Sequence, residues 1–417
     1  STGRTRPSAK WNFSKLFALL HVHPSRLRGA MSRVWWLCAL SIVTETVTTQ
    51  AHNKTALVTG AAGFVGSHVA RHCLSLGMRV IAMDDLSGGF VSNLPDGVRW
   101  VQGDIKDPLV VERIFSERID YVYHLAAYAA EGLSHFVRSF NYRTNLVGSI
   151  EILNQAIKHK TDCFVFTSSI AVYGSQMRDR PQGDVRGLTE EDPPSPEDPY
   201  GISKYAVEMD LRAAHELYGI DFVVFRPHNV YGPHQNMFDK YRNVVGIFIN
   251  QMFHGLPMTI FGDGEQVRAF SFIDDVAPII ASGPLLPAAR NQVFNVGADV
   301  PYTVNQLSRA TAQAMGLPIY PIDRQPARME VGAAVSNHDR VKSVFGPPPP
   351  VSLQDGLNRT VAWFRNMGRA FRPVEFQTVE IKRRMPPSWL RPDLRETAHC
   401  DGSVVAHDAN EVKSPEL

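Results

Sequence analysis

Two patterns of hydrophobic and polar positions alternate from residue 54 to about residue 225. Short apolar runs predict buried strands, and longer segments with apolar positions three and four apart predict amphipathic helices. The strands are expected at residues 55–59, 79–83, 98–101, 121–125, 163–167 and 221–225. The helices are expected at residues 64–76, 108–117, 137–159 and 199–218. This alternation is typical of βαβ units, so we expect an α/β fold built on a parallel sheet.

The alternation weakens after Arg226, where Asn, Gly, Pro and aromatic residues become frequent. Residues 175–198 are rich in Pro, Asp, Glu and Gly, which predicts a surface loop. Two strand-like stretches are expected to return to the main sheet, at residues 270–274 and 292–296. Further helices are expected at residues 244–254, 302–315 and 352–366.

These changes divide the chain into four parts. The regular alternation defines a first domain at residues 54–225, and residues 226–368 form a smaller second domain. Residues 1–53 are basic and rich in Ser and Thr, and we expect this N-terminal extension to be largely disordered. Residues 369–417 are first basic and then polar, and we expect a poorly ordered tail.

The N-terminal extension holds one short apolar run, Met31 to Val43, behind a single arginine. If Met31 starts translation, residues 31–51 are a candidate signal or membrane anchor. No stretch of roughly eighteen apolar residues occurs in the chain, which argues against a stable membrane span. We therefore expect a cytoplasmic protein, with the secretory pathway as the alternative if this run acts as a signal.

Three glycines follow the first predicted strand, at Gly60, Gly63 and Gly66. In a dinucleotide-binding turn the first permits the tight turn, the second lets the backbone approach a pyrophosphate, and the third lets the helix pack against the strand. The free N–H groups at the start of the helix then face the phosphates. The predicted cofactor-binding residues of this loop include Phe64 and Val65, and the fold is predicted to be of the Rossmann type, a doubly wound parallel sheet.

Asp84 ends the second predicted strand about twenty residues after the glycines. A carboxylate at this place accepts the ribose hydroxyls of NAD and repels the 2′-phosphate of NADP, so NAD is the expected cofactor. Asp104 and Ile105 follow the third strand, where Asp104 is placed either to meet the adenine or to cap the next helix. Ala126 is one of the small residues after the fourth strand that let the backbone approach the dinucleotide.

The overall composition is that of a globular enzyme of one large or two modest domains, with 44% hydrophobic and 20% charged residues in 417. A net charge of +2 gives no reason to expect a nucleic-acid partner. The four cysteines are scattered and show neither metal-type pairing nor a disulfide framework, so no metal site is expected.

Tyr200 and Lys204 lie four residues apart in a predicted helix and share one face of it. A nearby ammonium lowers the pKa of a phenol from its usual value of about 10, and the nicotinamide ring of NAD acts in the same direction. The resulting tyrosinate can take a proton from a hydroxyl while hydride leaves for the nicotinamide. Ser169 follows a buried strand and is placed to hydrogen-bond the substrate oxygen. A solvated helix face and an ordinary turn are the alternatives, and the preceding glycine loop favours catalysis.

Six motifs occur in order along residues 54–366. They are Thr59-Gly-x-x-Gly-x-x-Gly66, His124-Leu-Ala-Ala127, Ser168-Ser-Ile-Ala-Val-Tyr-Gly174, Tyr200-x-x-x-Lys204, Arg226-Pro-His-Asn-Val-Tyr-Gly-Pro233 and Gly262-Asp-Gly-Glu-Gln-Val-Arg268. Together they resemble the extended short-chain dehydrogenase/reductases of the NAD-dependent epimerase/dehydratase family. The closest resemblance is to nucleotide-sugar epimerases typified by UDP-glucose 4-epimerase.

The resemblance implies roles for the catalytic candidates. Tyr200 would be the acid and base, Lys204 would bind the nicotinamide ribose and tune the phenol, and Ser169 would hold the sugar 4-hydroxyl. The implied reaction passes through a 4-keto sugar that turns before hydride returns to its opposite face. The implied substrate pair is UDP-glucose and UDP-galactose.

For the smaller domain the resemblance implies binding of a UDP-sugar. Asn229 and Asn243 would contact the uridine diphosphate, and Arg268 would pair with the diphosphate, with an ordinary surface ion pair as the alternative. Arg328 resembles a second diphosphate arginine, but the glycine usual between this arginine and the following acid is absent. The family commonly forms dimers through the helices expected here at residues 137–159 and 199–218, so a homodimer is expected.

Other activities of the same fold fit less well. A nucleotide-sugar dehydratase needs an acid and a base where this chain has Ile170 and Ala171, and a UDP-glucuronate decarboxylase needs charged residues where it has Gly201 and Tyr205. The unusual stretch at residues 128–134 leaves an epimerase of UDP-glucuronate or another sugar open. A non-catalytic NAD-binding scaffold is the alternative from another class, and the intact serine, tyrosine and lysine argue against it.

Overall fold

The computed structural model describes residues 51–179, 187–239, 241–327, 332–367, 379–386 and 389. The apolar run predicted as a candidate signal, up to residue 50, lies outside these described residues. Within them, no helix has both the length and the apolar character needed to cross a membrane.

Seven parallel strands form the main sheet, in the order β11-β6-β5-β4-β1-β2-β3. The strands are β1 (Thr55–Thr59), β2 (Arg79–Asp84), β3 (Arg99–Gln102), β4 (Tyr121–His124), β5 (Cys163–Thr167), β6 (Asp221–Pro227) and β11 (Gln292–Val296). The order reverses between β1 and β4, as it does in a doubly wound sheet. The predicted fold class is therefore confirmed.

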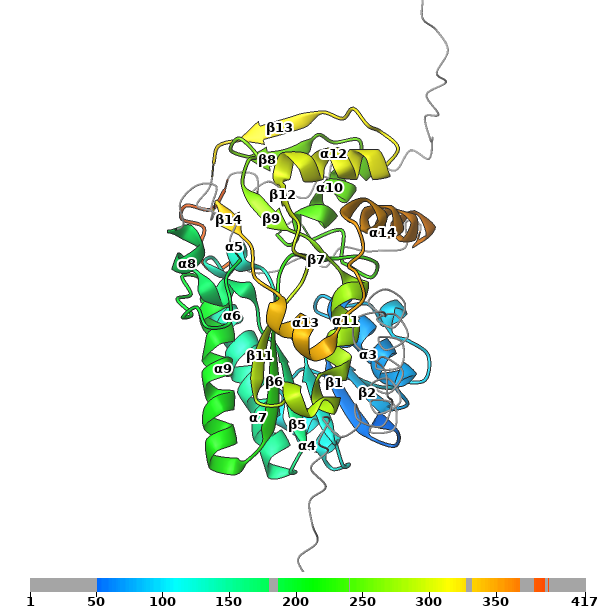
Figure 1. Cartoon of the computed structure of the whole chain (residues 1–417), viewed down its shortest axis with the longest axis vertical. Helices are drawn as coiled ribbons and strands as arrows, with labels where there is room; N and C mark the ends of the chain where they lie inside the picture. The colour runs from blue at the N-terminus through cyan, green and yellow to red at the C-terminus, as the bar shows by residue number, and fades with distance from the viewer. Residues whose placement is uncertain are drawn as a thin grey trace, which may run out of the picture.

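Helices cover both faces of this sheet (Figure 1). The face that carries Ala56 and Val58 packs against α3 (Phe64–Ser75) and α11 (Ile273–Ser282). The face that carries Leu57 packs against the three helices α4 (Pro108–Phe115), α7 (Gly148–Lys158) and α9 (Pro199–Tyr218). Successive strand residues point to opposite faces, so strands buried on both sides are apolar throughout, as the sequence pattern indicated.

The smaller domain lies above the main sheet in Figure 1 and contains short strands and three helices. β8 (Met258–Phe261) pairs with β13 (Ile322–Gln325), and β9 (Val267–Ala269) pairs with β12 (Pro301–Thr303) and β14 (Ala333–Ala334). The helices are α10 (Val244–Phe253), α12 (Val304–Ala314) and α14 (Leu353–Met367). All three were predicted within two residues at each end.

One of the two strands expected to return to the main sheet does not do so. β11 joins the sheet beside β6, but β10 (Ser271–Phe272) pairs with β7 (Val230–Tyr231) in a separate two-stranded sheet. At Ile273 the chain enters α11 instead, because Ile273, Val276, Ala277 and Ile280 form a buried stripe with helical spacing. The prediction of a strand at residues 270–274 is therefore wrong beyond Phe272.

The remaining helices are short. The helix predicted at residues 137–159 consists of α6 (Arg138–Tyr142) and α7, joined by a π-helical segment at Arg143–Val147. The predicted surface loop at residues 175–198 contains α8 (Ser175–Arg178), and its residues 180–186 lie outside the described part of the chain. The two others are α5 (Glu131–Ser134) and α13 (Asp339–Phe345).

Part of the predicted tail is packed against the first domain. Met385 is buried in a cluster with Leu133 and Val137, and Trp389 lies at its edge. The expectation of a poorly ordered tail is therefore wrong for residues 379–386, while most of residues 369–417 lie outside the described residues.

A buried ion pair joins α9 to the sheet. The carboxylate of Glu208 on α9 accepts from Arg226 on β6 at 2.6 and 3.0 Å, and the two side chains are 0% and 1% exposed. The Ser168 hydroxyl, just after β5, donates to the same carboxylate at 2.6 Å. Arg226 also donates to the Tyr173 hydroxyl at 2.9 Å. The rotation and height of α9 above the sheet are set by these contacts.

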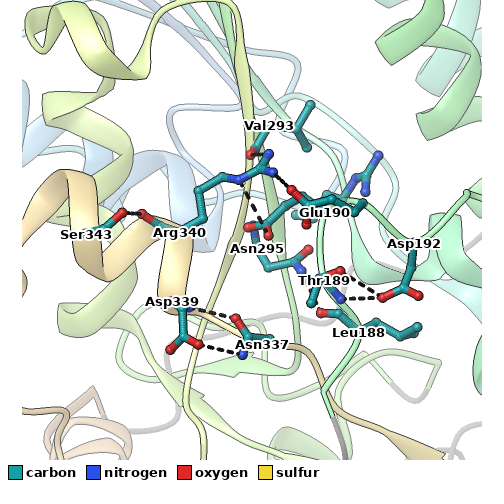
Figure 2. A network of polar contacts seen from close by, with 12 residues as sticks. Leu188, Thr189, Glu190, Asp192, Val293, Asn295, Asn337, Asp339, Arg340 and Ser343 are labelled. Carbon is teal, nitrogen blue, oxygen red and sulfur yellow. Dashed lines mark hydrogen bonds and ion pairs between the residues drawn. The ribbon is translucent and has the colours of Figure 1, made fainter.

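The same network continues to the last strand of the sheet and to α13. The Tyr173 hydroxyl donates to the side-chain oxygen of Asn295 on β11 at 2.8 Å. The Asn295 backbone N–H donates to Glu190 at 2.7 Å, and Figure 2 shows Arg340 of α13 between Glu190 and the Val293 carbonyl. The loop before α9, the last strand of the sheet and α13 are thereby tied together.

Replacing Glu208 tests how much this network contributes to stability. Glu208→Gln leaves the buried Arg226 guanidinium without its counter-charge, which costs about 3–5 kcal/mol of unfolding free energy. Glu216→Gln changes an exposed residue on the same helix and is expected to cost less than about 0.5 kcal/mol. Urea unfolding of the two variants and the native chain measures both effects, and equal losses would contradict the assigned role of the pair.

Candidate active site

A cavity of about 1350 Å³ opens at the carboxyl ends of the parallel strands. Its wall includes Gly60 after β1, Ala126 after β4 and Ser169 after β5, and also Arg268 and Val304 of the smaller domain. Pockets for a single small ligand typically measure about 300–1,000 Å³. This cavity therefore has room for a dinucleotide and a second ligand together, at the place where doubly wound sheets bind nucleotides.

The glycine-rich loop forms one end of the cavity, where all five residues predicted from it are exposed to the cavity. Gly60 has φ +70°, and a Cβ there would lie 2.7 Å from the backbone nitrogen of Ala126. A Cβ on Gly66 would lie 1.9 Å from the Gly60 carbonyl oxygen. Only glycine fits at these two positions. The helix that follows begins at Phe64 without a side-chain cap, so its first N–H groups are available to an anion.

Asp84 lies at the end of β2 and lines the cavity. Its carboxylate accepts from the backbone N–H of Ala62 at 3.0 Å and of Leu86 at 2.8 Å. Burial is the largest influence on this group and raises its pKa. The carboxylate is thus held in a set orientation beside the glycine loop, as a ribose-binding residue must be.

Asp104 is placed differently from Ile105, its neighbour. Ile105 lines the cavity, whereas Asp104 is absent from its wall. The Asp104 carboxylate accepts from the Lys106 backbone N–H and pairs with the Lys106 ammonium, both at 2.8 Å. The alternative role of Asp104, as the cap of the next helix, is incorrect, because Asp107 caps α4. A contact between Asp104 and adenine remains a prediction.

The helix α9 carries Tyr200 and Lys204 into the cavity. It begins at Pro199 because the Asp198 carboxylate caps it, accepting from the Gly201 N–H at 2.9 Å, and it ends at Gly219, which has φ +73°. These two signals explain why its predicted limits, residues 199–218, agree with the structure. Tyr200 lies in the first turn and is 8% exposed.

The pKa of the Tyr200 phenol lies well above its usual value, mainly because the group is buried. The Ser169 hydroxyl and the charge of Arg242 act in the opposite direction. Lys204 is not among the influences that lower it, and its Nζ lies 5.8 Å from the centre of the phenol ring. The expected lowering of this pKa by the nearby ammonium is therefore wrong for the protein alone.

Burial also shifts the pKa of Lys204. Its side chain is enclosed, its Nζ donates to the Thr167 carbonyl at 2.8 Å, and it lies 4.8 Å from the centre of the Phe166 ring. Desolvation lowers its pKa to about 7, and the charge of Glu208 opposes this shift. Burial thus favours the neutral amine of Lys204 more than it would for an exposed lysine.

Two adjacent serines at the end of β5 have different roles. Ser168 belongs to the cavity wall, but its hydroxyl donates to Glu208, as described above. Ser169 also lines the cavity, accepts from the Ala171 N–H at 3.1 Å, and acts to lower the pKa of the Tyr200 phenol against the effect of burial. The structure thus brings Ser169, Tyr200 and Lys204 to one wall, as predicted.

The predicted nucleotide contacts line the other end of the cavity. Asn229 donates to the Ala269 carbonyl at 3.2 Å, and Asn243 caps α10 while donating to the Val230 carbonyl at 2.6 Å. Both amides are held by the chain and also face the cavity. Arg268 lines the cavity as well, whereas Arg328 lies outside the described residues.

Several residues on the cavity wall were not predicted. Glu131 and Arg242 both act on the pKa of Tyr200, and Arg242 lies 4.4 Å from the centre of the Tyr128 ring and pairs with Asp239 at 2.8 Å. Glu131 falls in the stretch at residues 128–134 that differs from the usual epimerase loop, which was the available signal. Arg242 is adjacent to the predicted Asn243, but nothing in the sequence distinguishes it.

Four buried polar atoms of residues on the cavity wall have no partner in the described structure. They are the hydroxyls of Thr144 and Thr167, the side-chain oxygen of Gln235 and Nδ1 of His228. Buried polar groups are rarely left unpaired, so these atoms indicate a polar ligand. No group of three or more His, Cys, Asp or Glu side chains in the described chain is arranged to hold a metal ion.

The family model for the NAD dependent epimerase/dehydratase family matches residues 56–297, which is more than half of the chain. The chain belongs to this family. Its cofactor is NAD, and the cavity fits it: Gly60 and Gly66 leave the backbone open, α3 offers N–H groups, and Asp84 presents a carboxylate.

Individual relatives include more than one activity. A UDP-glucose 4-epimerase of Mycolicibacterium smegmatis is 34% identical over 318 residues, covering 74% of this chain and 98% of that relative. A dTDP-glucose 4,6-dehydratase of Actinoplanes sp. is 30% identical over 324 residues, covering 74% of this chain and 97% of that relative. Among solved structures, a Thermotoga maritima UDP-glucose 4-epimerase crystallised with UDP-glucose has 36% sequence identity to this chain and a TM-score of 0.69. The match covers 75% of this chain and 99% of that chain.

The role of Asp84 can be tested by cofactor preference. Asp84→Ala removes the carboxylate beside the glycine loop, so NAD binding should weaken about 10- to 100-fold and discrimination against NADP should decrease. Asp96→Asn alters an exposed carboxylate outside the cavity wall, and a change of less than about 2-fold is expected. Titration of both dinucleotides measures the effect; an unchanged preference in Asp84→Ala would overturn the ribose assignment.

Proposed function

We propose that the protein is an NAD-dependent nucleotide-sugar 4-epimerase that interconverts UDP-glucose and UDP-galactose. The observation that carries this proposal is one cavity whose wall holds Tyr200 and Ser169 together with the glycine-rich loop and the predicted nucleotide contacts. The 34% and 36% identical relatives named as UDP-glucose 4-epimerases support it.

In the proposed reaction, Tyr200 exchanges a proton with the sugar 4-oxygen. NAD, when bound, supplies the hydride acceptor and donor at C4. Ser169 would orient the 4-hydroxyl and shorten the path of the proton, since it lies on the same cavity wall as Tyr200 and its hydroxyl acts on the pKa of the phenol. The phenol must ionise to act as a base, and the positive charge of Arg242 favours the ionised form. In the return step the neutral phenol, which burial favours, donates its proton to the ketone oxygen.

Epimerisation also requires the ketone to turn between the two hydride transfers. Asn229, Asn243 and Arg268 come from the smaller domain and would hold the nucleotide, because amides and a guanidinium match the oxygens of uracil, ribose and diphosphate. The sugar would then be held mainly through its diphosphate. The size of the cavity allows the ring to rotate about this linkage.

A dehydratase is the second candidate, and relatives with this name support it at about 30% identity. Glu131 lines the cavity and acts electrostatically on Tyr200, so a second acid is close to the proposed centre. Against it, Ile170 and Ala171 are buried apolar residues at the positions where the dehydratase pattern has an acid and a base.

The two activities give different products. The purified protein, without added NAD, is incubated with UDP-glucose, UDP-galactose, UDP-N-acetylglucosamine, UDP-glucuronate and dTDP-glucose, and the products are identified by NMR. Inversion at C4 of UDP-glucose is the expected result. A 4-keto-6-deoxy sugar formed from dTDP-glucose, without C4 inversion of any UDP-sugar, would replace the proposal with the dehydratase.

The catalytic role of the Tyr200 phenol can be tested separately. Tyr200→Phe removes the proton donor but keeps the ring, so kcat should fall by about 10³-fold while NAD binding changes less than about 2-fold. Tyr218→Phe removes a hydroxyl from the exposed end of the same helix and should leave kcat unchanged. A Tyr200→Phe enzyme with near-native turnover would exclude the proposed mechanism.

We also propose that the chain forms a homodimer through α7 and α9. Ile202 and Met209 lie two turns apart on α9 and are 39% and 55% exposed, and Val147, just before α7, is 49% exposed. Exposed apolar side chains on one face favour association. Met209→Glu should convert a dimer to a monomer in light scattering, whereas Leu109→Glu, at an exposed site on α4, should not. A monomeric native chain would refute this proposal.

A further inference from the structure

A C-terminal segment, residues 379–386 and 389, packs against residues 128–140 of the first domain. Met385 is 5% exposed and contacts the cluster that contains Tyr128. Trp389 meets the rings of Phe136 and Tyr241 edge to face, with centroids 6.1 and 5.3 Å apart. The family model ends at residue 297, and relatives matched over 98–99% of their own length leave about a quarter of this chain unmatched.

The polar contacts of this segment hold its backbone in place. The Glu380 carboxylate accepts from the backbone N–H groups of Ser139 and Phe140, each at 2.8 Å. The N–H groups of Glu380 and Ile381 donate to the Phe136 carbonyl at 2.9 and 3.1 Å. The residues that follow Ile381 are therefore positioned by the first domain.

This positioning directs the C-terminal segment into the cavity that contains Tyr200. Arg383, Arg384, Met385 and Trp389 belong to the cavity wall, whereas Lys382 does not. Arg384 has φ +64°, a backbone conformation that few residues other than glycine adopt. Such a conformation is kept only where the surrounding contacts enforce it.

The two arginines add positive charge to the cavity wall. Both side chains are exposed to solvent, and neither has an ion pair or side-chain hydrogen bond with the residues that the structure describes. By contrast, Arg242 is paired with Asp239. Guanidinium groups bind carboxylate and phosphate oxygens in a bidentate manner, so two unpaired ones beside a ligand cavity favour an anion.

We propose that the C-terminal segment is a further part of the substrate site, in which Arg383 and Arg384 bind an anionic group of the nucleotide sugar. This inference rests on the proposed function. The anionic group is either the diphosphate or a carboxylate on the sugar. Trp389 and Met385 would cover the sugar side, because they pack on the loop that also carries Tyr128 and Glu131 into the cavity.

The test compares charge removal inside and outside the cavity. The double variant Arg383→Gln/Arg384→Gln is titrated calorimetrically with UDP, UDP-glucose and UDP-glucuronate, alongside the native chain and Lys382→Gln. The double variant should bind at least one of these ligands about 10-fold more weakly, while Lys382→Gln stays within about 2-fold. Equal thermal unfolding midpoints confirm that all three proteins are folded.

The pattern of losses identifies the group that is bound. Weaker binding of all three ligands assigns the arginines to the diphosphate, and weaker binding of UDP-glucuronate alone assigns them to a sugar carboxylate. Affinities within about 2-fold of the native chain for every ligand would overturn the proposal. Because the readout is binding, it is separate from the proposed function: a chain that binds UDP through these arginines but inverts no sugar refutes only the epimerase assignment.

Discussion

The buried ion pair between Glu208 and Arg226 is the contact on which the arrangement of the cavity depends. Tyr200, Lys204 and Glu208 stand four residues apart on α9 and so share the face that meets the sheet. A buried carboxylate is costly unless a cation and hydrogen-bond donors satisfy it, and here Arg226 and Ser168 do so. These partners lie on β6 and just after β5, so a rotation of α9 would break several bonds at once. The position of the phenol in the cavity follows from this constraint.

Burial then sets the charge of the two groups that face the cavity. It raises the pKa of Tyr200 and lowers that of Lys204 to about 7, so both side chains are driven toward their neutral forms. A neutral phenol is suited to donate a proton, and a lysine that titrates near neutrality responds to any charge placed beside it. A charged ligand in the cavity would therefore shift both groups, which suits the proposed epimerisation, in which one set of residues serves both directions.

Much of the fold could be predicted because its central strands are buried on both faces. A strand such as β1 is apolar throughout, and the limits of β1, β5 and α9 agree with those predicted from the sequence. The stretch at residues 270–274 was misassigned because a short apolar run is compatible with either a strand or a helix. The helix forms because the buried stripe continues with helical spacing to Ile280 on α11, which packs against α3.

The features of the site were likewise predictable only in part. Gly60 and Tyr200 could be placed in one site from sequence, because the carboxyl ends of parallel strands meet at one edge of the sheet. The pKa of Tyr200 could not be predicted from the sequence. The spacing along the helix shows that Lys204 is near, but it does not show how deeply either group is buried. Trp389 belongs to no motif, and its place on the cavity wall depends on contacts with Phe136 and Tyr241, which are far away in the sequence. Local patterns thus identify the residues suited to the chemistry, whereas this part of the cavity wall depends on where a segment distant in the sequence packs. If the cavity binds a nucleotide sugar as proposed, selectivity among related sugars can change most readily at this part of the wall.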